Sequence, residues 1–153
     1  MGTAEQHDQQ GAEGAQGAQG AQGAAPAILL YSDDVDTREQ VRLAVGRRLG
    51  RGAPEIRWVE AATAAEVIRQ VELGGFDLLV LDGEAGKVGG MGIARQLKDE
   101  IYECPPVLLL TGREQDAWLG SWSRADAVVS RPIDPVQLPR VVAELIAARA
   151  LTA

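Results

Sequence analysis

Charged and hydroxyl side chains follow directly after four short apolar runs of the chain. Asp82 follows the run 76–81 and precedes a glycine, and the other three runs lead into Ser32-Asp33-Asp34, Thr111-Gly112 and Ser130-Arg131-Pro132. An aspartate can act as a nucleophile toward a phosphoryl group. Because that group carries charge on three oxygens, its site also needs a cation and hydroxyl or N–H donors. Asp82, Thr111 and Arg131 are residues of these types.

Asp33 adds a second carboxylate to this set, and Asp34 adds a third. Clustered carboxylates repel one another unless they are protonated or bridged by a cation. Oxygen ligands with open positions for water suit Mg²⁺, so Asp33 and Asp82 predict a magnesium site. A structural role is the alternative for both Asp33 and Asp34, because an aspartate at this place can cap the helix that follows.

Five apolar runs alternate with segments of helical periodicity from Pro26 onward, which indicates a parallel sheet with helices on both faces. The predicted strands are 27–31, 55–60, 76–81, 107–110 and 126–129. This (βα)₅ pattern predicts an α/β fold, a flavodoxin-like doubly wound parallel sheet with strand order 2-1-3-4-5. Right-handed crossovers would place the carboxyl ends of strands 1, 3, 4 and 5 along one edge. The polar residues after these runs are therefore expected to meet.

Capping residues predict where the helices begin and end. Asp36 and Glu39 form a capping-box pattern for the first helix, and Gly50 is expected to close it; Thr63 and Glu66 form the same pattern for the second. A fourth helix is expected over 114–124. The last helix is expected from Pro135 or a residue or two later, because Pro139 fits poorly inside a helix that begins there.

Composition restricts the setting of the protein. Residues 1–25 contain no Ile, Leu, Val or aromatic residue, so we expect a disordered Gly/Ala/Gln-rich tail there and one domain over 26–153. A net charge of −7 argues against nucleic acid and anionic membranes as partners, and no apolar run approaches a membrane span. The lone Cys104 and the lack of a secretory leader pattern indicate the cytoplasm. The excess of arginine over lysine, with abundant alanine, indicates a high-GC, actinobacterial source.

Residues 27–151 resemble the receiver domain of two-component response regulators. The resemblance rests on the acidic turn with Arg38 five residues past Asp33, the lone Asp82, and Gly90 eight residues beyond it, together with Thr111 and a basic residue before Pro132. It implies that Asp82 accepts a phosphoryl group from a histidine kinase or a small phosphodonor, with Mg²⁺ as cofactor. It also implies that Asp33 and the backbone carbonyl of Glu84 bind the metal, that Thr111 binds phosphoryl oxygens, and that the Arg131–Pro132 bond is cis.

Three residues depart from the pattern of that family. Ser32 stands in the place of the first acid, Arg131 in the place of a lysine, and Val128 in the place of an aromatic residue. A guanidinium is a wide planar fork and not a compact point charge, so Arg131 either pairs a phosphate or holds Asp82 in a standing ion pair. Because Ser32 replaces an acid, Mg²⁺ binding is expected to be weaker than in the family, unless Asp34 turns toward the metal site as a further ligand.

The best-supported function at this stage is a stand-alone receiver without an output domain, which is no enzyme and acts through protein contact. A phosphorylation-independent pseudo-receiver is the alternative, and a small flavin- or nucleotide-binding enzyme is disfavoured because the acidic turn at Ser32-Asp33-Asp34 would repel a phosphate. Trp118 and Trp122 share a helix face and predict a surface for an unidentified downstream protein. Alternatively, this region could form a homodimer interface, made by the helix 114–124, the strand 126–129 and the last helix.

Overall fold

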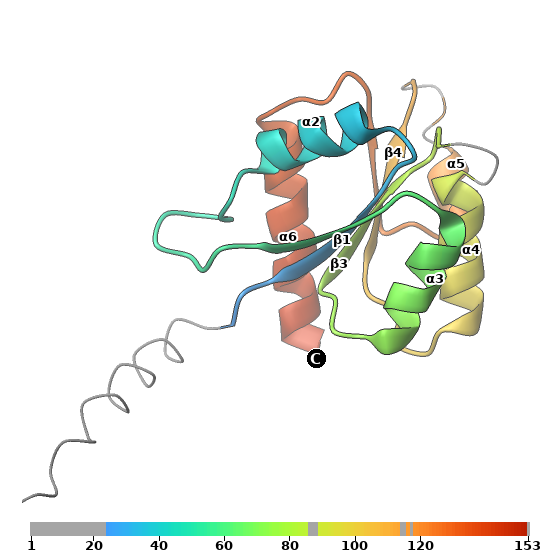
Figure 1. Ribbon diagram of the computed structural model, residues 1–153, viewed down its shortest axis with the longest axis horizontal. Coiled ribbons are helices and arrows are strands. Elements are labelled where there is room, and N and C mark those ends of the chain that lie inside the picture. The colour runs from blue at the N-terminus through green and yellow to red at the C-terminus, as the bar shows by residue number, and fades with distance from the viewer. Residues whose placement is uncertain (1–23, 86–88, 114–115, 117, 153) are drawn as a thin grey trace, which may run out of the picture.

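The computed structural model describes residues 24–85, 89–113, 116 and 118–152. The elements in these ranges are β1 (Ala27–Tyr31), α2 (Val35–Val45), β2 (Arg57–Ala61), α3 (Ala64–Leu73), β3 (Leu78–Asp82), α4 (Gly90–Glu100), β4 (Val107–Thr111), α5 (Leu119–Ser123), β5 (Ala127–Ser130) and α6 (Gln137–Thr152). The strands form a five-stranded parallel sheet in the order β2-β1-β3-β4-β5 (Figure 1). The predicted flavodoxin-like (βα)₅ fold and its strand order are confirmed.

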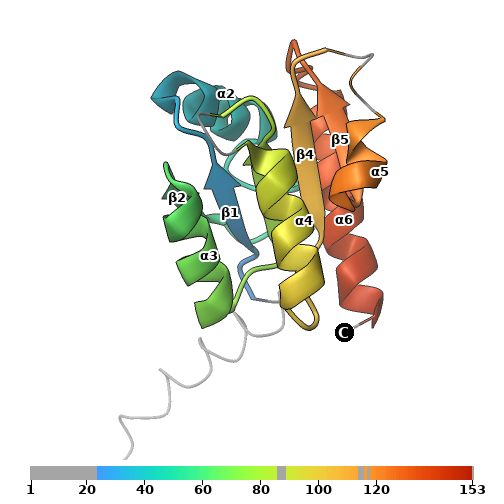
Figure 2. The ribbon, with the colours of Figure 1, turned by 90° about the vertical axis from the view of Figure 1, so that its right-hand side faces the viewer.

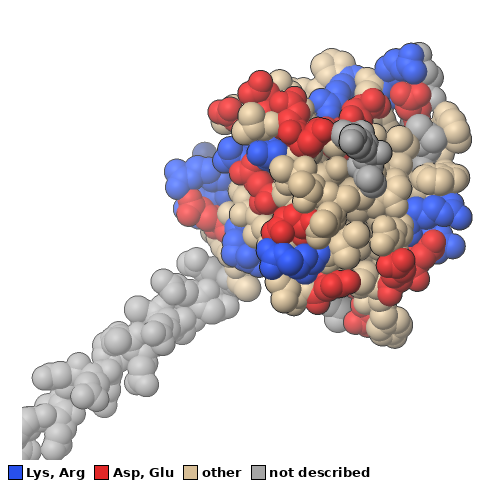
Figure 3. All heavy atoms as spheres, turned by 45° about the vertical axis from the view of Figure 1, so that its right-hand side comes forward, with Lys and Arg blue, Asp and Glu red and all other residues tan. Residues whose placement is uncertain are grey.

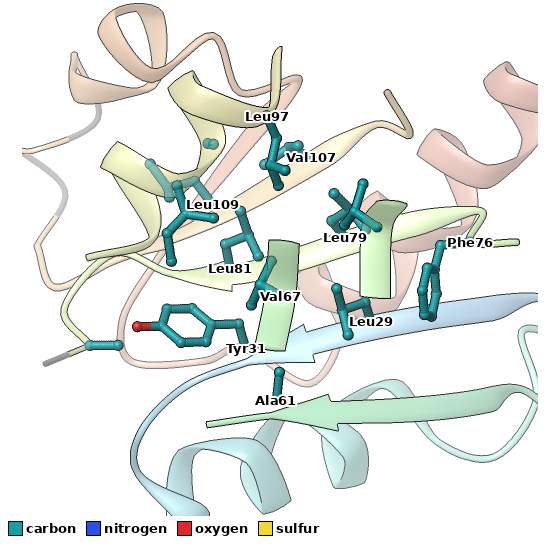
Figure 4. Close-up of a cluster of buried hydrophobic side chains, with 14 of the residues drawn as sticks. Leu29, Tyr31, Ala61, Val67, Phe76, Leu79, Leu81, Leu97, Val107 and Leu109 are labelled. Atoms are coloured by element: carbon teal, nitrogen blue, oxygen red, sulfur yellow. The ribbon is translucent and has the colours of Figure 1, made fainter. Parts of the chain in front are cut away.

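Helices cover both faces of the sheet. The helices α3, α4 and α5 lie on one face, and α2 and α6 lie on the other (Figure 2). Every residue of β1, β3 and β4 is buried, as expected for parallel strands that are covered on both sides. One core joins Leu29 to Val67 of α3 and Leu97 of α4 (Figure 4). The other core includes Val41 of α2 and Val142 of α6.

Strand register brings the predicted site residues to one edge of the sheet. Tyr31 pairs with Leu81, so Ser32 and Asp82 are the next residues of their two strands. Thr111 pairs with Ser130, which places Arg131 directly beyond the end of β5. Asp82 is the last residue of β3, and the sequence pattern had predicted it just outside the strand. The meeting of the four strand ends follows from this register.

The first helix begins two residues earlier than predicted. Asp34 is its N-cap, with a side chain that accepts a hydrogen bond from the amide of Asp36, so the expected cap at Asp36 is wrong. The helix also ends at Val45, where Gly46 has a φ of +89°, and not at Gly50. In contrast, the predicted cap at Thr63 is confirmed, because its Oγ1 accepts from the amide of Glu66 at 3.2 Å.

The helices α5 and α6 can be compared with the ranges that the sequence predicted for them. The segment predicted as a helix over 114–124 contains only the short α5, and residues 114, 115 and 117 lie outside the described residues. The helix α6 begins at Gln137, two residues after Pro135, as expected. Pro139 is its third residue. The amide of Leu138 already donates to the carbonyl of Asp134 at 3.1 Å, so the missing N–H of Pro139 costs the helix one bond, to the carbonyl of Pro135. Within the described part of the chain, no helix is long and apolar enough to cross a membrane.

Candidate functional site

Asp82 is a buried carboxylate whose two oxygens both accept hydrogen bonds. Its residue exposure is 3%, which leaves almost no contact with water. Oδ1 accepts from Nη2 of Arg131 at 2.7 Å and from the amide of Glu84 at 2.9 Å. Oδ2 accepts from Oγ of Ser32 at 2.8 Å. Because a buried charge is tolerated only when it is paired and hydrogen-bonded, these contacts offset the cost of burying the Asp82 carboxylate at the sheet edge.

Arg131 supplies the cation that faces Asp82. Its backbone amide donates to the carbonyl of Thr111 at 2.9 Å, which fixes the end of β5 beside β4. Nη1 makes a long hydrogen bond of 3.4 Å to Oγ1 of Thr37 on α2, so the guanidinium spans β3 and α2. The Nε is buried and has no hydrogen-bond partner among the described residues. The Arg131–Pro132 bond is cis, in agreement with the expectation from the family pattern.

Ser32 belongs to the site, although the sequence pattern marked it only as a departure from the family. Its side chain is fully buried. Oγ donates to Asp82 and accepts from the amide of Asp34 at 3.1 Å. Its carbonyl accepts from Nη1 of Arg38 at 2.6 Å, and Nε of Arg38 pairs with Glu60 at 2.9 Å. Arg38, an element of the family resemblance, therefore holds the residue that touches Asp82.

Asp34 is the N-cap of α2. This agrees with the structural role that the sequence offered as the alternative to metal binding. Oδ1 accepts from the amide of Asp36 at 3.0 Å, and Oδ2 accepts from Oγ1 of Thr37 at 3.0 Å. These bonds, the one from Thr37 first, lower the pKa of Asp34 below its ordinary value. Both carboxylate oxygens are therefore engaged by the first turn of the helix, and Asp34 does not turn toward Asp82.

Asp33 and Asp82 lie near the same phenol. Burial, and then the negative charges of Asp33 and Asp82, raise the pKa of Tyr31 above its ordinary value. Tyr31 ends β1 inside one of the two cores, where Figure 4 shows its ring among the aliphatic side chains. Asp33 itself is exposed.

The loops after β4 and β3 are in contact beside Thr111, through Gly112 and Glu84. Oγ1 of Thr111 is buried and lies 3.0 Å from Oγ of Ser130 and 3.3 Å from the carbonyl of Arg113. The carboxylate of Glu84 accepts from the amide of Gly112 at 3.1 Å. This side-chain contact had no signal in the sequence pattern, which pointed only to the backbone carbonyl of Glu84.

Gly90 explains the eight-residue spacing that formed part of the resemblance. A Cβ at this position would lie 2.7 Å from the carbonyl oxygen of Asp82. The first residue of α4 therefore packs directly on the backbone of Asp82, and only glycine allows this approach. The position of Asp82, the candidate phosphoacceptor, is therefore fixed by packing against the first residue of α4 as well as by its hydrogen bonds.

The donors around Asp82 do not fit a tight Mg²⁺ site. Mg²⁺ prefers near-octahedral oxygen ligands that are free to face it. Both oxygens of Asp82 already accept hydrogen bonds, Asp34 caps a helix, and Ser32 offers a hydroxyl where the family pattern has its first acid. In the ranges that the structure describes, no three acids, histidines or cysteines cluster in a way that could hold a metal.

Trp118 and Trp122 border an apolar hollow next to this site. They are 66% and 48% exposed, although tryptophan is ordinarily largely buried. The hollow has a volume of about 360 Å³ and is lined by these two residues and by Gly89, Met91 and Gly92. Arg95 lies over the ring of Trp122, with its guanidinium carbon 5.0 Å from the ring centroid. The predicted surface tryptophans are thus exposed, and the start of α4 forms the facing wall.

Val128 is fitted to α5. A Cβ on Gly120 would come within 2.3 Å of Cγ2 of Val128, so the valine fills the space that the glycine leaves. Val128 is partly buried and packs against the core on this face. The position that holds an aromatic residue in the family is therefore a packed contact between β5 and α5 in this protein.

Acidic and basic side chains are interspersed over the face shown in Figure 3, which spreads charge of both signs across the surface. Surface ion pairs, such as Lys98 with Asp126 at 2.7 Å and Arg124 with Asp99 at 2.6 Å, also join charges of opposite sign. Proteins that bind nucleic acid present clustered basic charge. That face gives no support for a nucleic-acid partner.

No family model matches the chain. An uncharacterized response regulatory protein of Mycobacterium tuberculosis, found in strains CDC 1551 / Oshkosh and ATCC 25618 / H37Rv, is 57% identical over 123 residues, which cover 80% of this chain and 92% of the relative. A mycobacterial relative agrees with the actinobacterial source that composition predicted.

Solved structures share the fold at low sequence identity. A CheY-like response regulator receiver domain protein from Methanospirillum hungatei has a TM-score of 0.68 at 19% identity, covering 85% of this chain and all of that one (100%). A response regulator protein from Thermotoga maritima, in complex with Mg²⁺ and BeF, has a TM-score of 0.65 at 23% identity, covering 78% of this chain and 98% of that one. At these identities the likeness concerns the fold.

Proposed function

Because the chain belongs to the response-regulator family and has the receiver fold, we propose that it is a stand-alone receiver that accepts a phosphoryl group on Asp82. The observation that carries this proposal is the position of the Asp82 carboxylate at the sheet edge, 2.7 Å from a guanidinium and 2.9 Å from a backbone amide. A cation and an N–H donor beside a nucleophilic carboxylate are what a transferred phosphoryl group requires. The phosphodonor is a histidine kinase or a small acyl phosphate.

The chemistry can be written for acetyl phosphate as the donor. A carboxylate oxygen of Asp82 attacks phosphorus, the new O–P bond forms, and the bond from phosphorus to the acetate oxygen breaks. Acetate leaves with the bonding electron pair, so no proton has to move. Arg131 stabilises the charge on the phosphoryl oxygens. Thr111 is the hydroxyl at the end of the neighbouring strand, and it can donate to a phosphoryl oxygen after it releases Ser130 or Arg113.

A phosphorylation-independent pseudo-receiver is the second candidate. It is favoured by one observation, the standing ion pair between Arg131 and Asp82 together with the hydrogen bond from Ser32. The contact to whichever oxygen of Asp82 attacks phosphorus must rearrange before that oxygen can carry a phosphoryl group. In this second function the ion pair is permanent, and the chain acts only as a binding module. Neither candidate is an enzyme that turns over a separate substrate.

Intact-mass spectrometry separates the two candidates. The full chain is incubated with acetyl phosphate and, in parallel, with phosphoramidate, each with and without Mg²⁺. A phosphoreceiver gains the mass of one phosphoryl group, and Asp82→Asn does not. Asp99→Asn, which removes a carboxyl from the exposed side of α4, should still be labelled. Unlabelled wild type beside a labelled control receiver would favour the pseudo-receiver.

The output of this receiver is proposed to be contact with a partner protein at the Trp118–Trp122 hollow. The hollow is apolar, and at its edge Arg95 lies over the ring of Trp122 and donates from Nη1 to the carbonyl of Trp122 at 2.8 Å. An apolar side chain together with a carboxylate is the chemistry that fits this edge. A photo-cross-linking residue in place of Trp118 should capture such a partner in cells, whereas one in place of Leu43, exposed on α2, should not. An adduct of twice the chain mass would instead identify a second copy of the chain.

A further inference from the structure

A closed ring of hydrogen bonds links the start of α2 to Asp82. Oγ of Ser32 accepts from the amide of Asp34 at 3.1 Å and donates to Oδ2 of Asp82 at 2.8 Å. Arg131 donates to the other oxygen of Asp82 at 2.7 Å and to Oγ1 of Thr37 at 3.4 Å. Thr37 in turn donates to Oδ2 of Asp34 at 3.0 Å, and the ring closes at Asp34, whose amide donates to Ser32.

We infer that this ring takes the place of a divalent cation at Asp82. Ser32 is the residue that determines whether Asp82 needs such a cation. The inference rests on the proposed function of Asp82 as phosphoacceptor and concerns what balances its charge before phosphorylation. In most acidic sites a cation relieves the repulsion between neighbouring carboxylates. Here the guanidinium of Arg131 neutralises Asp82, and the hydroxyl of Ser32 occupies its second oxygen.

The chemistry of position 32 determines whether a cation is needed. The Oγ of Ser32 lies 2.8 Å from Asp82, so a carboxylate at position 32 would bring two negative charges into contact. That arrangement is stable only if a proton or a cation is shared between them. A hydroxyl removes the repulsion and donates a hydrogen bond instead. The serine therefore removes both the demand for a cation and one of its ligands.

Asp34 cannot restore the missing ligand without loss elsewhere. Its carboxylate accepts from the amide of Asp36 and from Oγ1 of Thr37, and it is the N-cap of α2. Turning it toward Asp82 would uncap the helix and break the ring at Thr37. The exposed Asp33 and the Glu84 carbonyl are then the candidate oxygens left for a metal that also contacts Asp82. Two carboxylates set against one guanidinium attract a divalent cation weakly.

Calorimetric titration of the full chain with Mg²⁺, in the absence of any phosphodonor, tests the inference. Loss of free Mn²⁺ measured by electron paramagnetic resonance provides a second probe. Ser32→Ala removes the donor to Asp82, and we expect its affinity for Mg²⁺ to exceed that of wild type by about tenfold, the worth of a hydrogen bond to a charged group. Ser32→Asp adds a ligand and a charge, and we expect a larger gain.

Ser123→Ala is the matched control. Ser123 is also a fully buried serine, but its Oγ donates to the carbonyl of Gly120, away from Asp82. Its removal should leave Mg²⁺ affinity at the wild-type value. Thermal unfolding of each variant shows whether it is folded, and Ser32→Ala carries the test if Ser32→Asp does not fold.

The result that would overturn the inference is Mg²⁺ binding by Ser32→Ala and Ser32→Asp that is no tighter than that of wild type. Tight wild-type binding, equal to that of the variants, would have the same meaning. Because this titration uses no phosphodonor, its failure is distinct from a failure of Asp82 to be phosphorylated. A wild type that is phosphorylated without Mg²⁺, and binds it weakly, would support both proposals.

Discussion

Nη2 of Arg131 lies 2.7 Å from Oδ1 of Asp82, and the two side chains differ sharply in exposure: 27% for the arginine and 4% for the aspartate. The partly exposed arginine thus places its positive charge next to a carboxylate that is almost fully shielded from water. Lysine would place a compact charge there, whereas the guanidinium fork also reaches Thr37 on α2. This ion pair is therefore a structural tie as well as part of a candidate phosphoryl site.

Replacement of Arg131 by alanine is expected to destabilise the fold. It would leave a buried carboxylate without its cation, which costs about 3–5 kcal/mol in a fully buried pair. Since the arginine is partly exposed, water will screen part of the loss, and we expect about 2 kcal/mol. Urea unfolding of wild type and Arg131→Ala measures this difference.

A double-mutant cycle with Asp82→Asn supplies the control. If the cost comes from an uncompensated charge, Arg131→Ala should cost much less in the Asp82→Asn background, because the buried group is then neutral. Equal costs in the two backgrounds would show that packing by the arginine stem, and not the ion pair, stabilises the fold.

Sequence patterns predicted the sheet edge well because they depend on short-range order. The apolar run before Asp82 and the alternation of strands and helices determine which residues stand at strand ends. The capping of α2 was harder. Asp34 and Asp36 are both good N-caps, and the pattern Asp36-x-x-Glu39 favoured the wrong one, whereas Asp34 also gains the hydroxyl of Thr37.

The contacts that distinguish this site were beyond the reach of sequence patterns. Ser32 and Asp82 are fifty residues apart in the chain, and their hydrogen bond exists only because β1 and β3 are neighbours in register. The bond from Gly112 to the Glu84 carboxylate depends likewise on two loops that meet. The short α5 has a physical cause as well, because a glycine lies within it and Arg124 ends it in the left-handed conformation.

Gly90→Ala is predicted to destabilise the protein, because the new Cβ would lie 2.7 Å from the carbonyl oxygen of Asp82. Overpacking against backbone costs about 1–3 kcal/mol. Gly92→Ala is the matched control on the same helix, since a Cβ there meets nothing within 4 Å. It should stabilise α4 by up to about 1 kcal/mol through helix propensity. Chemical denaturation of both variants checks the prediction, and equal effects would contradict the close packing at Gly90.

Acid should weaken the fold partly through Glu66. Hydrogen bonds from Arg69, and then from Gln70, lower the pKa of Glu66 from 4.5 to about 2 in the folded protein. A depressed folded pKa means that the contribution to stability is present above pH 4.5 and is lost as the pH falls toward about 2. Because this carboxylate is on the surface, its share of the total is small.

Denaturant unfolding between pH 2 and pH 6 tests this window, which brackets the two pKa values of Glu66. Glu66→Gln should flatten the dependence of the unfolding free energy on pH relative to wild type. Glu72→Gln removes a carboxyl from the same helix without touching the pair with Arg69, and it should keep the wild-type slope more closely. A steeper slope in Glu66→Gln would contradict the sign of the shift.

The tryptophans of the hollow should matter for contacts with other molecules and little for stability. Trp118 and Trp122 are 66% and 48% exposed, so replacing both by alanine should change the unfolding free energy by no more than about 1 kcal/mol, including the loss of the contact with Arg95. Trp58→Ala is the contrasting control, because Trp58 packs against the buried core beside α2 and α6 and its loss should cost about 3 kcal/mol. Urea unfolding ranks the variants. If the surface pair proved as costly as Trp58, both residues would be packing elements, and the partner surface would have to lie elsewhere.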